Sequence, residues 1–425
     1  MRCWLGLLLF LNACGSCSKN DASSLAPDAA LASGDARVAT AEVLPRCRGE
    51  AQRLDLGEGT VVGNVAVGAD GLLVGLVRTA GGKRTAAVLR ASLDLATQKT
   101  IELGAAFGDD PPPSPRWNGT TAYASWLERP TRDGGPRIRT LKVARLTDDR
   151  VGLESQIEQQ ADESTVFDVA WSDGRGLAAW DEDAPNKPDA ALPSISDRGY
   201  VKVQGLGGPE SKPRVASPET SDADSPQLVS RPGGYWLAWL ARRVEEAPSG
   251  VEGPGEDKDF RWVEAVMLDA RGEPQGPVRR VSSERGRAVA FDMARNGADL
   301  VVLVQDEAAA AEGGGARLLR YVVGGPIVPP TDLVDGGVGH ALAEVVAAPE
   351  GTPAHWLAWS DVAEHAHLTA LGNGLVPSGP AAASLEPAFD GARVLAETTD
   401  PKAGLYVLVS GEKADKPEIR RFACR

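Results

Sequence analysis

The chain has 425 residues, and its 59 Asp and Glu residues outnumber 45 Lys and Arg residues, giving a formal net charge of −14. This charge argues against nucleic acid as a partner and against a polybasic contact with anionic lipid headgroups, because both depend on clustered Lys and Arg. A hydrophobic content of 42% is sufficient for a core, while 48 Gly and 30 Pro residues favour many turns and short strands over long helices.

The N-terminus is typical of an export signal. Arg2 precedes the short apolar run Trp4–Leu11, and the small residue Ala13 follows shortly after that run. A positive charge, an apolar core and a small residue in this order predict a secretory signal peptide. We therefore exclude residues 1–13 from the fold.

The segment Leu11–Cys14 resembles the lipobox of bacterial lipoproteins. This resemblance implies that Cys14 is lipidated and becomes the mature N-terminus. It also implies, from Gly15 after that cysteine, an outer-membrane lipoprotein whose lipid is its only contact with the membrane. The periplasmic and the surface-facing leaflet both remain open, and an ordinary cleaved signal peptide is the alternative interpretation.

Residues 14–46 are predicted to form a flexible linker. Residues 18–42 within it are rich in Ala, Ser and Asp and contain no aromatic residue, so they have little apolar surface to bury. About 30 flexible residues reach roughly 30 Å, which would hold the folded region, residues 47–425, clear of the lipid.

A short apolar run led in by glycine or another turn residue recurs seven times, about every 50 to 60 residues. The copies are Gly71–Arg78, Gly119–Leu127, Gly174–Asp181, Gly234–Leu240, Gly297–Gln305, Ala354–Ser360 and Gly404–Ser410. Each is predicted to be the second strand of a four-stranded unit. The fourth unit has strands at 225–231, 235–241, 260–269 and 277–283, with a hairpin turn at Asp269–Gly272.

The second strands are apolar on both faces. Trp236 and Trp239 are three residues apart and therefore point to opposite sides of one strand. A sheet that is dry on both faces must lie between two others, and radial packing of small antiparallel sheets achieves this. The sequence predicts an all-β, seven-bladed β-propeller, with six or eight blades as alternatives. Two β-sandwich domains are the main rival, but the only candidate linker, 244–260, falls inside a unit.

The last unit lacks an obvious fourth strand, and the segment Ala51–Gly57 belongs to no unit. We expect this segment to complete the last blade, so that N- and C-terminal strands close the ring. Cys47 would then lie beside Cys424, and exported proteins meet an oxidising compartment, which favours a disulfide between them. Two free cysteines are the alternative.

Long loops between second and third strands are predicted in units two to four, at 129–136, 181–197 and 242–259. Binding residues concentrate on long loops held by a rigid scaffold. Carboxylates cluster in two of these loops and are the candidate binding residues: Asp181, Glu182, Asp183, Glu245, Glu246, Asp257 and Asp259. A solvated face without a ligand is the alternative. No spacing typical of a calcium loop and no catalytic motif is present, so we predict no metal, no cofactor and no catalytic residue.

From residue 50 to 424 the chain resembles Gram-negative bacterial lipoproteins with degenerate β-propeller repeats. The resemblance lies in units such as Tyr235–Leu240 followed by Leu268–Ser282, and it implies no catalytic residues. We expect a monomeric, lipid-anchored propeller that binds a protein or polysaccharide at the cell envelope. A propeller-type glycoside hydrolase or lyase with acidic catalytic residues is the alternative.

Overall fold

The structure is a computed structural model, and it describes most of the region predicted to fold, residues 47–425. The described residues are 52–107, 110–129, 139–147, 150–158, 166–183, 199–207, 212–243, 260–296, 299–307, 315–324, 330–334, 338, 344–346, 355–363, 365–372, 376, 389–390, 393–400, 404–410 and 417–423. Cys14 and the segments predicted to be the signal peptide and the linker lie outside them. Within these residues, no helix has the length and apolar character needed to cross a membrane.

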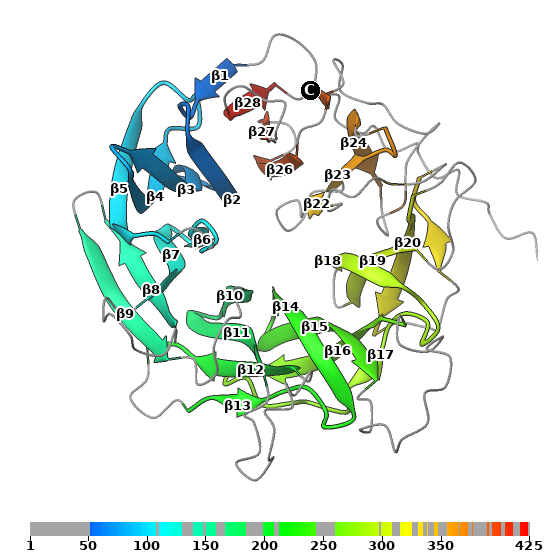
Figure 1. Cartoon of the computed structure of the whole chain (residues 1–425). Helices are drawn as coiled ribbons and strands as arrows, with labels where there is room; N and C mark the ends of the chain where they lie inside the picture. The colour runs from blue at the N-terminus through cyan, green and yellow to red at the C-terminus, as the bar shows by residue number, and fades with distance from the viewer. Residues whose placement is uncertain are drawn as a thin grey trace, which may run out of the picture. The chain divides into compact units, whose positions relative to one another are not determined.

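The described residues form seven four-stranded antiparallel sheets within the compact unit Val43–Arg425. The sheets follow one another around a central axis, each with its first strand innermost (Figure 1). We number them I to VII in the order of these first strands. The prediction of an all-β propeller is confirmed.

Every sheet has the same order of strands, from a first, innermost strand to a fourth, outer strand. The first strands of sheets I to VII are β2 (Thr60–Gly68), β6 (Ser114–Asn118), β10 (Phe167–Ser172), β14 (Ser221–Arg231), β18 (Ala288–Asn296), β22 (Glu344–Val346) and β26 (Arg393–Asp400). The second strands are β3 (Gly71–Ala80), β7 (Thr121–Glu128), β11 (Arg175–Asp183), β15 (Gly234–Arg243), β19 (Asp299–Asp306), β23 (His355–Ser360) and β27 (Gly404–Ser410). The third strands are β4 (Lys83–Ala91), β8 (Thr140–Leu146), β12 (Gly199–Gly205), β16 (Trp262–Asp269), β20 (Arg317–Val323), β24 (His365–Leu371) and β28 (Glu418–Phe422). The outer strands are β5 (Gln98–Ala105), β9 (Val151–Glu158), β13 (Arg214–Val215), β17 (Arg279–Arg280), β21 (Thr331–Asp332), β25 (Phe389–Asp390) and, for sheet VII, β1 (Gln52–Asp55).

The core lies between the sheets, because each second strand is buried on both sides. In β15, Trp239 packs in a cluster with Leu177 and Ala179 of β11, whereas Trp236 packs in another with Val302 of β19. Neither tryptophan exposes more than 2% of its surface. Residues on the two faces of one strand therefore pack against the sheet before it and the sheet after it. Burial of each large apolar side chain stabilises the fold by about 1.5–3 kcal/mol.

The two ends of the folded region meet in sheet VII. Strand β1 pairs antiparallel with β28, with Leu54 opposite Ile419, and the Arg421 guanidinium donates a 2.7 Å hydrogen bond to Gln52 Oε1. Leu54 is buried in a cluster that also contains Leu76 of sheet I. Strand β1 thus contributes to the core between the last and the first sheet. Cys47 and Cys424 lie outside the described residues.

Candidate functional site

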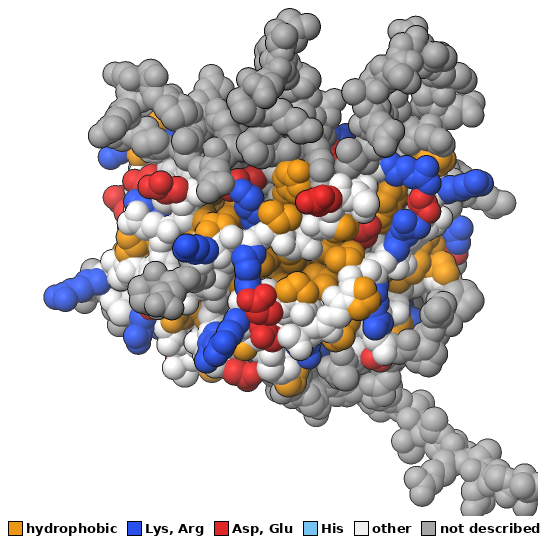
Figure 2. Space-filling view, turned by 90° about the horizontal axis from the view of Figure 1, so that it is seen from below, with side chains coloured by type: hydrophobic (Ala, Val, Ile, Leu, Met, Phe, Trp, Pro, Cys, Tyr) orange, Lys and Arg blue, Asp and Glu red, His pale blue; other side chains and the backbone are white. Residues whose placement is uncertain are grey.

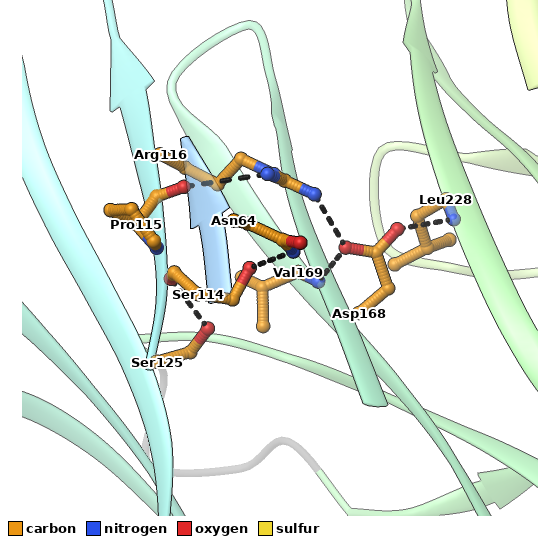
Figure 3. Close-up of polar contacts among 8 residues, drawn as sticks. All are labelled: Asn64, Ser114, Pro115, Arg116, Ser125, Asp168, Val169 and Leu228. Atoms are coloured by element: carbon orange, nitrogen blue, oxygen red, sulfur yellow. Dashed lines mark hydrogen bonds and ion pairs between the residues drawn. The ribbon is translucent and has the colours of Figure 1, made fainter. Parts of the chain in front are cut away.

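A series of hydrogen bonds joins the innermost strands of neighbouring sheets (Figure 3). Asn64 Nδ2 on β2 donates to Ser114 Oγ on β6 at 3.1 Å. Arg116, also on β6, contacts Asp168 Oδ1 on β10 at 3.3 Å. The other carboxylate oxygen of Asp168 accepts the backbone N–H of Leu228 on β14 at 2.8 Å. Side-chain hydrogen bonds, as well as apolar packing, therefore hold these four first strands in place relative to one another.

Asp168 is satisfied within the protein. Its Oδ1 atom also accepts the backbone N–H of Val169 at 2.8 Å, so the carboxyl group accepts three hydrogen bonds from three partners. Charge-assisted hydrogen bonds of this kind fix a side chain. We conclude that this polar group holds sheets II, III and IV together, and it leaves the carboxyl little capacity for a ligand.

A second polar group lies where β14 begins. Ser225 has a left-handed backbone with φ of 56°, at a β-bulge between Asp224 and Gln227. Its backbone N–H donates to Asp181 Oδ2 at 3.1 Å. A non-glycine residue with a left-handed backbone is strained and persists only where its surroundings hold it. β-Bulges of this kind often lie beside functional sites.

The carboxyl groups around this bulge differ in their environments. Burial raises the pKa of Asp224 above its ordinary value, against an opposing attraction to Arg261. Asp222 accepts the backbone N–H of Gly199 at 2.6 Å and forms an ion pair with Arg242. Asp222 is therefore compensated, whereas Asp224 is the carboxyl group whose ionisation the fold disfavours.

The structure places the predicted acidic residues differently from the sequence analysis. Asp181 and Glu182 were expected in a loop, but both lie in β11, paired with Val201 and Tyr200 of β12, and both are buried. The loop assignment for these two residues is wrong because β11 continues through Asp183. Asp183 is in the strand, and its side chain is not described.

Glu182 is engaged inside the sheet. It accepts a 2.6 Å hydrogen bond from the Trp180 indole and forms an ion pair with Lys202 at 2.6 Å, while exposing only 2% of its surface. Buried charges are retained when they are paired in this way. The remaining candidates, Glu245, Glu246, Asp257 and Asp259, lie outside the described residues.

Sheet IV carries a pocket at the end where β15 finishes and β16 begins. We call this end of the sheet the upper rim. The pocket has a volume of about 220 Å³ and is lined by Arg243, Phe260, Trp262, Glu284 and Arg285. These residues come from the end of β15, the start of β16 and the connection from β17 to β18. Three separate segments therefore converge on this one cavity.

A buried network holds the wall of the pocket. Trp262 is buried, and its indole N–H donates to Glu264 Oε1 at 3.0 Å. Glu264 also accepts from the Trp239 indole at 3.1 Å and from Ser221 Oγ at 3.2 Å. Ser282 Oγ accepts the backbone N–H of Val263 at 2.9 Å, which ties the β17–β18 connection to the start of β16.

The outer side of the pocket is positively charged. Glu284 binds Arg243 through one carboxylate oxygen and Arg280 through the other, the latter at 2.6 Å. The hydrogen bond from Arg243 is the main reason that the pKa of Glu284 is lowered. The Arg280 guanidinium lies 5.1 Å from the centre of the Trp262 ring, and Arg285 is exposed. Arg243 and Arg280 therefore share one carboxylate, and Arg285 adds a further positive charge to the lining of the pocket.

Sequence reasoning missed this basic group because it used the net charge of the whole chain. The fourth unit and the connection after it contain Arg231, Arg242, Arg243, Arg261, Arg271, Arg279, Arg280, Arg285 and Arg287, but the acidic residues of the same stretch outnumber these arginines. Lys and Arg side chains are also visible on the outer face in Figure 2, in spite of the negative net charge. Among the described residues, no three His, Cys, Asp or Glu side chains are arranged to hold a metal ion.

Comparison with family models and with curated proteins gives no match. The fold is similar to solved structures, among them the β-propeller domain of the Trilobed protease from Pyrococcus furiosus, with 11% identity, a TM-score of 0.50, and coverage of 87% of this chain and 94% of that one. The fold is also similar to the polysaccharide lyase Uly1, with 11% identity, a TM-score of 0.51, and coverage of 87% of this chain and 91% of that one. Prolyl oligopeptidase B from Galerina marginata is a third similar structure, with 10% identity, a TM-score of 0.50, and coverage of 83% of this chain and 47% of that one.

Identities this low show the fold alone. The Pyrococcus furiosus domain is described as having an open velcro topology, whereas β1 pairs with β28 in this chain. The comparisons and the sheets together place the chain among β-propeller proteins.

Proposed function

We propose that this chain is an exported, lipid-anchored β-propeller that binds a protein or a polysaccharide at the cell envelope. The observation that carries this proposal is the pocket on the upper rim of sheet IV, which three segments build and which a buried network supports. Ligand sites are concave, with a few convergent polar groups on a rigid scaffold.

Binding is favoured over hydrolysis because three of the acidic side chains described in sheets III and IV are engaged within the protein. Asp168, Asp181 and Asp222 all accept backbone N–H groups. A glycoside hydrolase needs two carboxyl groups free to act on the substrate. The acidic residues described at this rim therefore suit structural roles better than general acid–base chemistry.

The binding part of the proposal is tested with the full chain in detergent micelles. The immobilised protein is offered envelope polysaccharides and solubilised envelope proteins, and bound material is identified by mass spectrometry and glycan analysis. A saturable ligand that a charge change in the pocket removes supports the proposal. No saturable ligand in either fraction contradicts it.

The anchor is tested separately. Replacing Cys14 by Ser removes the acceptor of the lipid, so the variant should move from the membrane fraction to the aqueous phase on detergent phase separation. The natural protein should remain in the detergent phase. A Cys14→Ser variant that still enters the detergent phase contradicts lipid anchoring at this residue, without affecting the binding proposal.

A further inference from the structure

We propose that the pocket formed by Arg243, Phe260, Trp262, Glu284 and Arg285 binds the carboxylate of a uronate unit in an anionic polysaccharide. This inference rests on the proposed function and specifies its ligand class. It starts from the size of the pocket, about 220 Å³, which is below the roughly 300–1,000 Å³ of sites for drug-sized ligands. The pocket therefore suits one sugar unit of a longer polymer.

The charges of the pocket suit a carboxylate. Glu284 is paired with Arg243, which lines the pocket, and with Arg280, which lies over the Trp262 ring, so its negative charge holds both guanidinium groups in place. Arg285 adds a third, exposed guanidinium from the same connection. A guanidinium presents two parallel N–H donors that match the two oxygens of a carboxylate. Arg285 is the residue best placed to make this contact with an incoming ligand.

The surroundings favour a polysaccharide over a protein partner. Stable protein interfaces have an apolar centre. Large exposed apolar side chains in the described part of the chain belong to other segments, such as Val61, Val151, Val215 and Val289, and none belongs to sheet IV. Phe260 is partly buried and offers a limited apolar wall of about the width of a sugar ring.

The negative net charge does not prevent this binding. At physiological ionic strength, the Debye length is about 8 Å, so the carboxylates of the other sheets are screened. Among the described residues that line the pocket, two arginines accompany one carboxylate, Glu284. A polymer with one carboxylate per sugar unit also meets less repulsion than a phosphate backbone, whose charges are closer together.

The experiment measures binding of polygalacturonate to the full chain in detergent micelles by calorimetry. Methyl-esterified polygalacturonate is the neutral counterpart, and polyglutamate represents an acidic protein segment. We expect polygalacturonate to bind, with weaker binding at higher salt, and the methyl ester to bind at least tenfold more weakly. Equal binding of the methyl ester would overturn the proposal, because the carboxylate would then play no part.

The decisive variant is Arg285→Gln, with Arg271→Gln as its control. Both arginines are exposed and belong to the same sheet, but Arg271 lies in the β16–β17 hairpin at the opposite rim. Arg285→Gln should weaken polygalacturonate binding about tenfold or more, and Arg271→Gln should leave it within about twofold. Equal effects of the two variants would show that only net charge matters and would overturn the site.

Two further outcomes separate the alternatives. Arg285-dependent binding of polyglutamate without binding of polygalacturonate would assign the pocket to an acidic protein partner and overturn the polysaccharide. Loss of polygalacturonate binding on deletion of residues 244–257, with Arg285→Gln unchanged, would place the binding element in that acidic segment instead. If the chain captures another envelope ligand but no uronate polymer, this inference fails while the proposed function stands. If it captures neither, both fail.

Discussion

The pairing of β1 with β28 can be tested with one core substitution and one matched control. Leu54 and Arg53 are neighbours on β1, but Leu54 is 6% exposed and packs into the cluster between sheets VII and I, whereas Arg53 is exposed. Leu54→Ala removes buried methyl groups and leaves a cavity, which costs about 2–5 kcal/mol. Arg53→Ala should change the free energy of unfolding by no more than about 0.5 kcal/mol.

The magnitude at this site lies near the middle of that range. Leu54 is almost completely buried, but it belongs to a four-residue outer strand that can relax towards the cavity, so we expect about 3 kcal/mol. One kcal/mol shifts the melting temperature of a domain of 150–250 residues by about 2–4 °C, and a longer chain by less. Leu54→Ala should therefore lower the Tm by about 4–6 °C, and Arg53→Ala by about 1 °C or less.

The assay is thermal unfolding followed by circular dichroism, with hydrogen exchange of the β1 amides as a second readout. Leu54→Ala should accelerate exchange in β1 and β28 together, because their hydrogen bonds are shared. Equal effects of the two variants on Tm, or fast exchange of the β1 amides in the unmodified protein, would refute closure of the ring by this strand.

Three other predictions follow from the described contacts. Burial raises the pKa of Asp224 above its ordinary 3.8, so ionisation of this carboxyl group opposes folding at neutral pH. Asp224→Asn should therefore raise the Tm at pH 7. This gain should disappear below about pH 4, where Asp224 is protonated in both the folded and the unfolded protein. Burial raises the pKa of Tyr235 from 10.0 to about 12, so the stability that this group contributes below pH 10 should be lost as the pH rises towards 12. Tyr235→Phe should be less stable by about 1 kcal/mol at pH 8, because it lacks the hydrogen bond to the Arg175 carbonyl. The variant should also lack the loss of stability between pH 10 and pH 12. Both variants are measured by unfolding at several pH values, and a Tm difference that is constant with pH would contradict the respective reasoning. Peptide mapping without reductant should find Cys47 joined to Cys424, because antiparallel pairing brings the residues before β1 and after β28 to one end; two free thiols would show that this prediction is wrong.

The repeat of second strands was predictable because burial on both faces leaves a strong sequence signal. Runs such as Gly234–Leu240 contain large apolar residues at successive positions, and strands β3, β7, β11, β15, β19, β23 and β27 lie where the seven runs predict them. A strand packed between two neighbours needs apolar residues on both sides whatever its neighbours' identity.

The buried charges were not predictable from single positions. Asp181 and Glu182 suggested a loop because isolated acidic residues are usually exposed. Their partners, Ser225 and Lys202, lie 44 and 20 residues away along the chain, so only the folded structure shows that the two charges are compensated. Sequence periodicity reports which face is apolar, but it carries no signal for such distant polar pairs.

The pocket on sheet IV was missed for a different reason. Its residues Arg243 and Glu284 are 41 positions apart and meet only because β15 ends beside the β17–β18 connection. Acidic residues outnumber basic ones within the fourth unit itself. Neither the net charge of the chain nor a count for this unit therefore shows that these arginines meet at one cavity.

The pairing of Gln52 with Arg421, 369 positions further along the chain, sets the order in which the protein can mature. Synthesis delivers β1 before every other described strand and β28 after them, so β1 has no partner until the intervening strands have emerged. Closing so long a loop is slow relative to forming a local hairpin. A chain that ends before β28 would leave the backbone N–H and C=O groups of β1 and β27 without their strand partner. Cellular proteases would then degrade such a chain before it could bind a ligand.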